Sequence, residues 1–315
     1  MIRYLLGRIP SILLVIFLAS IVAFILPRLA PGDPAVVMAG PDPTPEQVEA
    51  VREAAGFNRP LIEQYLSWVL GLFRGDLGVS FILNRPIGEL ILSRVESTLQ
   101  LAGLAAVFMI LLGFALGILG GSRLRRGSRL ALDMFNTAML ATPPFLVALV
   151  LILVFGIWLR ILPVSGEVGL SENFGLGLQY LLLPAAALAL TQAAVVGRLL
   201  QTSMLTTRGE EFIDLAVAKG ASPARVTFRH VLPASLDAAI VSIGLRIGEL
   251  LSGAIIIEAI FARNGLGQLA VQAVNNRDYF LIQTLVIGAV VIAVLSQLIS
   301  EVVMASLDPR IRLES

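Results

Sequence analysis

The chain has 315 residues, of which 57% are hydrophobic and 14% are charged, and its mean hydropathy is +0.88. This composition is typical of integral membrane proteins. The chain has no cysteine and one histidine, which excludes a metal centre or a catalytic pair built from those residues. The net charge of +1 gives no indication of a nucleic-acid partner, and we expect none.

Six stretches are long and apolar enough to cross a lipid bilayer, which takes about 20 apolar residues. Five of them carry no charged residue, and the remaining one carries Arg246, Glu249 and Glu258. The first stretch ends in Pro-Arg rather than in a small-residue cleavage site, so we interpret it as a retained anchor. The predicted fold class is therefore an all-α integral membrane protein with six transmembrane helices. The predicted spans are residues 9–27, 97–122, 134–159, 173–197, 238–261 and 279–300.

Basic residues gather in alternate connections between these spans. When six spans alternate, those connections and both termini fall on one side, which the positive-inside rule makes cytoplasmic. The use of many arginines with a single lysine indicates a GC-rich bacterial or archaeal genome. We therefore expect a multi-pass protein of the cytoplasmic membrane of a bacterium or archaeon, with both termini inside. The basic residues on which this orientation rests are Arg3, Arg8, Arg123, Arg125, Arg126, Arg129, Arg208, Lys219, Arg225, Arg229, Arg310 and Arg312.

The largest polar insert, residues 30–96, falls on the opposite, outer side. Thr44 is a good helix cap, Pro45 suits the first helical position, and Gln47 completes a capping box before Gly56 ends the helix. A second amphipathic pattern covers residues 61–72. We expect an outer two-helix insert on a single permease domain, residues 1–315, whose core covers residues 97–306.

The polar segment between the fourth and fifth spans, residues 205–233, predicts two short helices with a break between them. Residues 214–219 are compatible with a helix, and Gly220 suits the left-handed position just past its end. Ser222 is a good cap and Pro223 suits the first position of a second helix, which we expect to stop before Pro233. Small residues in this segment would let another protein surface approach closely, as in a docking element.

The spacing of this segment resembles the cytoplasmic "EAA" coupling loop of ATP-binding-cassette importer permeases. The match is Asp214-x-Ala216, then Gly220 and His230-x-Leu232-Pro233, while Asp214, Leu215 and His230 depart from the usual Glu, Ala and Ile. In that family the loop is a helix that sits in a groove of the ATPase subunit. The resemblance implies that the ATPase-coupling residues are Glu211, Asp214, Ala216, Lys219, Gly220, Ser222, Arg225, His230 and Pro233.

Further fragments from about residue 2 to 312 resemble the dipeptide/oligopeptide (B-type) branch of these permeases. They include Pro31-Gly32-Asp33-Pro34, Gly75-Asp76-Leu77-Gly78, Gly253-x4-Glu258 and Asp308-Pro309-Arg310. The resemblance implies alternating access and a heterodimer with a second homologous permease subunit. It also implies two ATPase subunits and an extracytoplasmic solute-binding protein. The solute stays open among dipeptides, oligopeptides, glutathione, nickel chelates and some oligosaccharides.

The chain itself has no ATPase site. The loop that binds ATP phosphates requires Gly-Lys-Ser/Thr, and the only lysine, Lys219, stands in Ala218-Lys219-Gly220. ATP and Mg therefore belong to partner subunits, and we expect no cofactor, metal or catalytic residue here. The string Gly265-x-Gly267-x-x-Ala270 lacks a βαβ context, so it predicts a turn into a short outer helix rather than a dinucleotide site.

Arg246, Glu249 and Glu258 are ionisable residues in an apolar stretch, where a charge costs about 2.5–3.5 kcal/mol at the bilayer centre. Arg246 and Glu249, three residues apart, can pair on one helix face. The pair either packs between helices or lines the translocation path, and Glu258 is a candidate gate. An ion-coupled secondary transporter, using Glu249 and Glu301, is the alternative function. A membrane-embedded hydrolase would need a nucleophile and a base that one surface histidine does not supply.

Glycines and prolines predict how the spans pack and bend. Gly113, Gly117 and Gly121 recur every four residues, a spacing that favours close helix packing in lipid. Pro143-Pro144 and Pro184 predict kinks in their spans, and kinks can also act as hinges.

Overall fold

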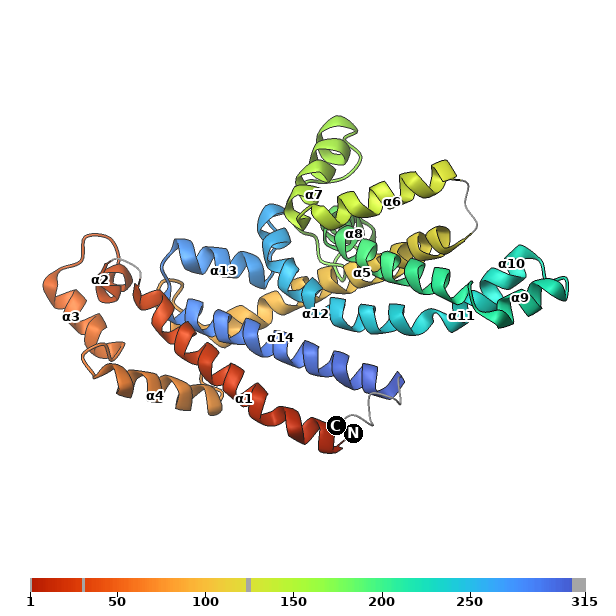
Figure 1. Ribbon diagram of the computed structural model, residues 1–315. Coiled ribbons are helices and arrows are strands. Elements are labelled where there is room, and N and C mark those ends of the chain that lie inside the picture. Colours follow the sequence, from red (N-terminus) through yellow and green to blue (C-terminus); the bar gives the residue numbers. More distant parts are fainter. Residues whose placement is uncertain (1, 30–31, 123–125, 308–315) are drawn as a thin grey trace. The chain divides into compact units, whose positions relative to one another are not determined.

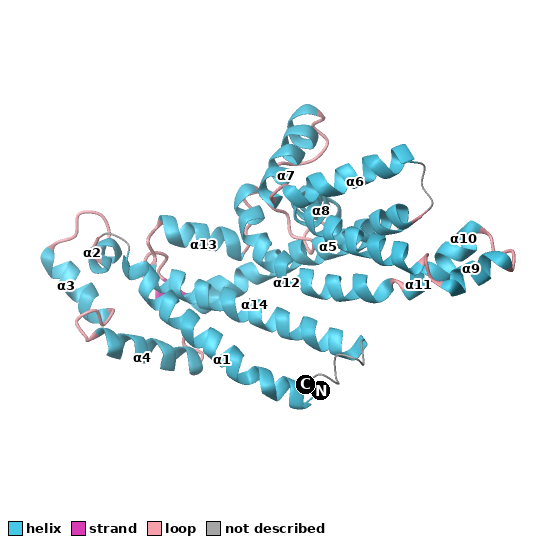
Figure 2. Ribbon diagram, viewed as in Figure 1, coloured by secondary structure: helices cyan, strands magenta, loops and turns pink. Residues whose placement is uncertain are grey.

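The computed structural model describes residues 2–29, 32–122 and 126–307, and this part of the chain is helical almost throughout (Figures 1 and 2). It forms two compact units. The core unit contains Thr98–Arg263, and the N-terminal unit contains Ile2–Ser97 and Asn264–Val294. Helices α5 (Ile87–Gly121) and α14 (Tyr279–Leu307) contribute residues to both units. The single permease domain, with an insert over 30–96 and a core over 97–306, stays a prediction.

The N-terminal unit begins with α1 (Ile2–Ile25), which continues into the 3-10 turn η1 (Leu26–Leu29). The helices α2 (Pro34–Ala39), α3 (Pro45–Ala54) and α4 (Leu61–Phe73) follow, then a strand pair of β1 (Val79–Ser80) and β2 (Arg85–Pro86). Helix α13 (Leu266–Asn275) begins directly after Gly265, which confirms the predicted turn into a short helix. The core of this unit comprises Ile87, Leu90, Leu269, Ala273 and Leu281.

The insert has three helices where the sequence predicted two. Helix α3 begins as predicted, because the Gln47 N–H donates to Thr44 Oγ1 at 3.3 Å and the Thr44 N–H donates to Gln47 Oε1 at 2.9 Å. Gly56 follows its end with φ +70°. Helix α2 was missed because its six residues are too few to show a periodicity. It is capped by Asp33, whose side chain accepts from the Ala35 N–H at 2.9 Å.

Helix α8 (Phe174–Thr207) is the central helix of the core unit. It contacts α6 (Arg126–Ala141), α7 (Pro144–Leu151) and α12 (Leu236–Ile260) (Figure 1). Its buried residues Leu181 and Leu188 belong to one apolar cluster with Leu250 and Ile257 of α12.

The predicted close packing of the glycines is confirmed within the core unit. A Cβ atom added to Gly117 would lie 2.7 Å from the Leu200 side chain, and one added to Gly113 would lie 2.9 Å from Val196. On α8, a Cβ atom at Gly197 would likewise lie 2.9 Å from Leu116. Helices α5 and α8 therefore approach each other more closely than side chains at these positions would allow.

Five helices are long and apolar enough to cross a membrane, over Gly7–Leu29, Ile87–Gly121, Phe174–Thr207, Ala239–Ile260 and Tyr279–Leu298. The third predicted span, residues 134–159, is not one straight helix. It is divided between α6 and the pair of α7 with the π-helical η2 (Ile152–Trp158), bent by 111° at the break.

Prolines explain this bend. Pro143 and Pro144 carry no N–H, so α6 cannot continue through them, and Pro144 instead starts α7. The bent pair is either a broken sixth span or a re-entrant loop, so the fold is an all-helical membrane protein with five to six candidate spans and an extra N-terminal helical region. At Pro184, by contrast, α8 continues. Several residues behind the predicted orientation, Arg123, Arg125, Arg310 and Arg312, lie outside the described residues.

Candidate functional site

The segment Glu210–Pro233, named the 210–233 segment below, begins with a helix and a turn that agree with the prediction. Helix α9 (Glu211–Ala218) ends at Lys219, and Gly220 has φ +80°. The Gly220 N–H donates to the Val217 carbonyl at 2.9 Å and the Ala221 N–H donates to the Ala216 carbonyl at 3.1 Å. These two bonds form a Schellman motif. Among the described residues nothing lies within 4 Å of a Cβ added to Gly220, so only the backbone conformation requires glycine there.

The second helix does not stop before Pro233, which corrects the prediction. Helix α10 (Pro223–Arg225), the π-helical η3 (Val226–Val231) and α11 (Leu232–Ala234) follow one another without a break. Ser222 caps the first of them as predicted, accepting from the Arg225 N–H at 3.4 Å. Pro233 falls at the junction between the π-helical η3 and α11. The helix therefore runs through the proline.

An apolar cluster fixes the 210–233 segment to the membrane helices of the core unit. One buried residue of α9, Ile213, and two of η3 pack against buried residues of α8 and α12. These side chains pack the segment directly against the two membrane helices. The cluster comprises Leu200, Met204, Ile213, Val226, Val231 and Ala239.

Polar contacts of Arg208 and Ser235 reinforce this attachment at the two ends of the segment. Arg208 Nε donates to the carbonyl of Gly121 at 2.6 Å, at the end of α5, and Arg208 Nη2 donates to Thr227 Oγ1 at 2.7 Å. Ser235 Oγ donates to Thr207 Oγ1 at 3.0 Å, which joins the beginning of α12 to the end of α8. The 210–233 segment is therefore attached to α5, α8 and α12.

The exposed surface of the 210–233 segment mixes apolar and charged side chains. Phe212, Leu215, Val217 and Phe228 are 46–59% exposed, which is unusual for a polar connection. The structure records no ion pair or hydrogen bond within its described part for the side chains of Glu211, Asp214, Lys219 and Arg225. Of the predicted coupling residues, Ala216 and His230 are half-buried and the others are exposed: Glu211, Asp214, Lys219, Gly220, Ser222, Arg225 and Pro233.

Arg246 and Glu249 form the ion pair that their spacing predicts. Arg246 Nη1 lies 2.6 Å and 2.5 Å from the two carboxylate oxygens of Glu249, on the same helix, α12. The Arg246 side chain is half-buried and that of Glu249 is more exposed. Pairing on one helix lowers the cost of placing both charges in an apolar stretch.

Glu258 lies in a buried charge cluster that sequence reasoning missed. Its side chain is fully buried, and the nearby Arg263, 1% exposed, donates from Nη2 to Glu167 Oε1 at 2.9 Å. Burial lowers the pKa of Arg263, and the charges of Glu167 and Glu258 oppose that shift. A backbone bond of 2.8 Å from the Gly166 N–H to the Phe261 carbonyl holds the two chain segments together. The only signal in the sequence was an arginine shortly after a membrane glutamate.

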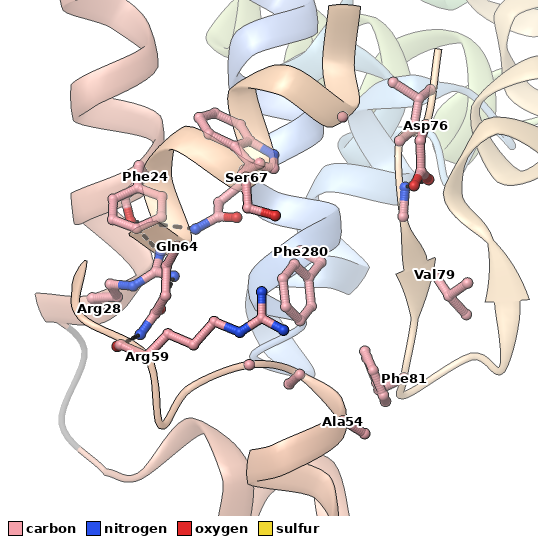
Figure 3. A pocket seen from close by; sticks show the side chains of 17 residues that line it. Phe24, Arg28, Ala54, Arg59, Gln64, Ser67, Asp76, Val79, Phe81 and Phe280 are labelled. Carbon is pink, nitrogen blue, oxygen red and sulfur yellow. Dashed lines mark hydrogen bonds between the residues drawn. The ribbon is translucent and has the colours of Figure 1, made fainter. Parts of the chain in front are cut away.

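A pocket of about 310 Å³ opens in the N-terminal unit between α1, α4 and the beginning of α14. Figure 3 shows the guanidinium group of Arg59 pointing toward Phe280, and Arg28 beside Phe24 and Gln64. Arg28 Nη2 donates to Gln64 Oε1 at 3.0 Å. The pocket therefore has a mixed polar and aromatic lining, and no residue of it belongs to the predicted site.

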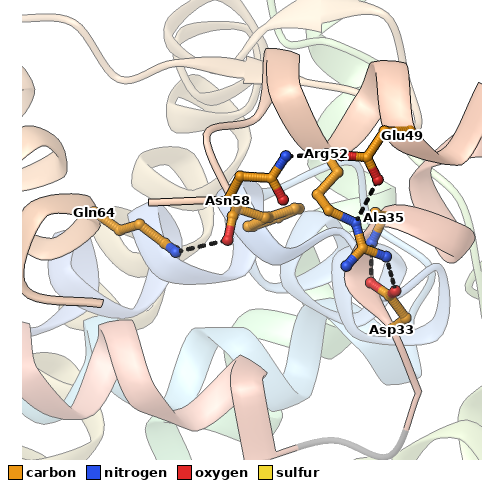
Figure 4. Close-up of polar contacts among 7 residues, drawn as sticks. Asp33, Ala35, Glu49, Arg52, Asn58 and Gln64 are labelled. Atoms are coloured by element: carbon orange, nitrogen blue, oxygen red, sulfur yellow. Dashed lines mark hydrogen bonds and ion pairs between the residues drawn. The ribbon is translucent and has the colours of Figure 1, made fainter. Parts of the chain in front are cut away.

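Polar contacts hold the turn between α3 and α4 beside this pocket. In Figure 4, Arg52 of α3 forms an ion pair with Asp33 and also contacts Glu49, 3.5 Å from Nε. Glu49 Oε1 accepts from Asn58 Nδ2 at 2.8 Å, and Gln64 Nε2 donates to the Phe57 carbonyl at 3.3 Å. The helices α2, α3 and α4 are thus linked in one polar network.

Two family descriptions match the chain over most of its length. Residues 111–313 match the binding-protein-dependent transport system inner membrane component, and residues 1–102 match the N-terminal region of the same kind of membrane component.

Individual relatives from the same kind of transport system also match the chain along almost its whole length. The chain is 34% identical over 309 residues to a probable peptide ABC transporter permease protein of Sinorhizobium fredii, covering 98% of this chain and 99% of the relative. It is 31% identical over 313 residues to the glutathione transport system permease protein of Escherichia coli strain K12, covering 99% of each. A solved structure of the MetNI methionine ABC transporter in inward-facing conformations matches with a TM-score of 0.59 and 16% identity, over 71% of this chain and 98% of that chain. At that identity the last match concerns the fold alone.

These matches decide the class of protein. Members of the family are multi-pass inner membrane proteins and usually carry no cofactor, and the ATPase activity lies in separate subunits. Dependence on a binding protein implies ATPase partners and a solute-binding protein. The ion-coupled secondary transporter is accordingly set aside. The chain belongs to the family of binding-protein-dependent transport system inner membrane components, and it is the permease subunit of an ABC importer.

Proposed function

We propose that this permease imports short peptides or a peptide-like solute such as glutathione. The proposal is supported by the names of two relatives that match along almost the whole chain, a peptide permease and a glutathione permease. The solute would be delivered by the binding protein and would pass between this chain and a second, homologous permease subunit. Both termini and the 210–233 segment would lie in the cytoplasm, where ATP is available.

Coupling to ATP hydrolysis is the role that we propose for the 210–233 segment. The observation that carries it is a surface of exposed apolar and charged side chains on two short helices that are firmly attached to three membrane helices. A helix seated in a groove of the ATPase would follow the closure of the ATPase pair and rock the spans. The coupling residues proposed are Glu211, Asp214, Ala216, Lys219, Gly220, Ser222, Arg225, His230 and Pro233.

We further propose that the Arg246–Glu249 pair lines the translocation path, because it is a charged pair in a membrane helix with the Glu249 carboxylate exposed. For Glu258, full burial beside Arg263 favours a structural part in a gate rather than contact with the solute. The double variant Arg246→Gln, Glu249→Gln tests the path role. Normal assembly with unchanged uptake would count against it.

The first experiment is to purify this chain from its native membrane in mild detergent and to identify the proteins that co-elute. Two ATPase chains and a second permease are expected. A native-membrane homodimer without ATPase, whose uptake survives ATP depletion, would refute the coupling proposal. The solute class is then tested by uptake of a labelled dipeptide and of labelled glutathione into proteoliposomes that contain the complex and its binding protein.

A further inference from the structure

Helix α4 in the N-terminal unit has an apolar outer face that no described part of the chain covers. Ile62, Leu66, Leu70 and Phe73 are spaced by four, four and three residues, so they form one continuous stripe along the helix. Their side chains are 51–86% exposed.

The face of α4 toward α1 carries the half-buried residues Gln64, Tyr65 and Trp68. Gln64 and Ser67 line the pocket described above, together with Arg28 of η1 and Gln283 of α14 (Figure 3). Gln283 is 1% exposed, and its Oε1 has no hydrogen-bond partner among the described residues. A helix in water buries its apolar face and exposes its polar one. Helix α4 instead leaves its apolar stripe exposed, which favours an apolar medium outside it.

The contacts between α4 and α1 place α4 at the level of the bilayer. Tyr65 Oη lies 2.7 Å from Ser20 Oγ, and the ring of Phe24 lies 5.4 Å from that of Tyr65 and 6.0 Å from that of Trp68. Helix α1 and η1 form the candidate membrane span Gly7–Leu29. Ser20 is nine residues before the end of this span, which corresponds to a depth of about 14 Å.

The same contacts give the direction of α4. Gln64 contacts Arg28, and Trp68, four residues later, contacts Phe24, four residues earlier in α1. Helix α4 therefore runs antiparallel to α1, and its C-terminal end lies deeper than its beginning. With 13 residues it is about 20 Å long, too short to cross a hydrocarbon core of about 30 Å.

We propose that α4 lies in the bilayer leaflet from which α1 emerges at Arg28, with its apolar stripe against the lipid acyl chains. Tyr65 and Trp68 would then face α1 within this leaflet, where the Tyr65 hydroxyl shares a hydrogen bond with Ser20. The only charged residue within α4 is Glu63, near its shallow end. The insert is thus anchored in the membrane and is not wholly extracytoplasmic.

The absence of cysteine from the chain makes a direct test practicable. Single variants Ile62→Cys, Leu66→Cys, Leu70→Cys and Phe73→Cys carry a nitroxide label in the purified importer, reconstituted into phospholipid nanodiscs. Electron paramagnetic resonance then measures collisions with oxygen, which concentrates in lipid, and with a water-soluble nickel chelate. We expect high oxygen and low nickel accessibility at all four positions. The control for a lipid-facing position is Phe17→Cys, an exposed residue of the candidate span in α1, which should give the same result. Phe73→Cys should report a greater depth than Ile62→Cys.

The control for water is Glu53→Cys on α3, an exposed position of the same unit. Nickel accessibility at Leu66 and Leu70 equal to that of Glu53 would place α4 in water and overturn the proposal. Low accessibility to both reagents with an immobilised label would also overturn it, because a protein, such as the second permease, would then cover the stripe. Using four positions keeps the test decisive if one labelled variant fails to assemble.

Discussion

Replacing Gly220 tests whether the turn in the 210–233 segment couples transport to ATP hydrolysis. Its φ of +80° is unfavourable for residues with a Cβ atom, at a cost of about 1–2 kcal/mol. In the described structure no atom lies within 4 Å of an added Cβ, so Gly220→Ala adds no new contact and the backbone cost stands alone. If the ATPase binds only the intact turn, this cost weakens ATPase binding about 5- to 30-fold.

The assay is titration of the purified ATPase subunits against the reconstituted permease, with uptake measured in parallel. Gly220→Asn should lose less ATPase affinity and less uptake than Gly220→Ala, because asparagine tolerates the left-handed conformation. Gly220→Pro should abolish uptake while membrane insertion survives, because proline fixes φ near −65°. The matched control is Gly103→Ala in α5, a helical glycine that also has nothing within 4 Å of its Cβ position. That substitution should leave ATPase affinity unchanged.

The diagnostic result is that ATPase affinity and uptake decrease in the order Gly, Asn, Ala, Pro at position 220. This order follows the backbone conformation that each residue tolerates and not the size of its side chain. Wild-type ATPase affinity and uptake in Gly220→Ala and Gly220→Pro would refute the reasoning. A loss in Gly103→Ala as large as that in Gly220→Ala would show that the assay reports general instability.

Three further predictions concern stability of the permease in detergent. Gly117→Ala would place a methyl group 2.7 Å from Leu200, so we expect a loss of about 1–3 kcal/mol and a lower Tm, which an unchanged Tm would contradict. Arg263→Gln leaves Glu167 and Glu258 without their buried cation and should lower the unfolding free energy by about 3–5 kcal/mol. Adding Glu167→Gln to this variant should recover part of the lost stability. No recovery would argue against the pairing of Arg263 with Glu167. Burial raises the pKa of Asp278, against opposing hydrogen bonds from Ser80 and Leu281, so the folded state holds a proton that the unfolded chain releases at about pH 4. The unfolding free energy should therefore fall as pH rises from about 4 through the raised pKa, and Asp278→Asn should remove this decrease.

Features set by neighbouring residues could be predicted from the sequence. The Thr44–Gln47 capping box, the positive φ of Gly220 and the Arg246–Glu249 pair each depend on residues within four positions of one another. The five continuous spans were predictable for a related reason, because an apolar run of that length determines its own helical state in lipid. The segment over residues 205–233 was likewise recognisable from its spacing.

Features that depend on distant segments were decided by the tertiary structure. Arg263 meets Glu167 across 96 residues, and the continuation of the helix through Pro233 depends on the packing of η3. The 111° bend shows that an apolar run can contain a turn, because hydropathy measures the affinity of a stretch for lipid and not its direction. Helix α4 was predicted as an amphipathic helix, but a periodicity does not say which face meets solvent. The contacts with α1 decide that, because they place Gln64, Tyr65 and Trp68 inside and leave the apolar stripe bare.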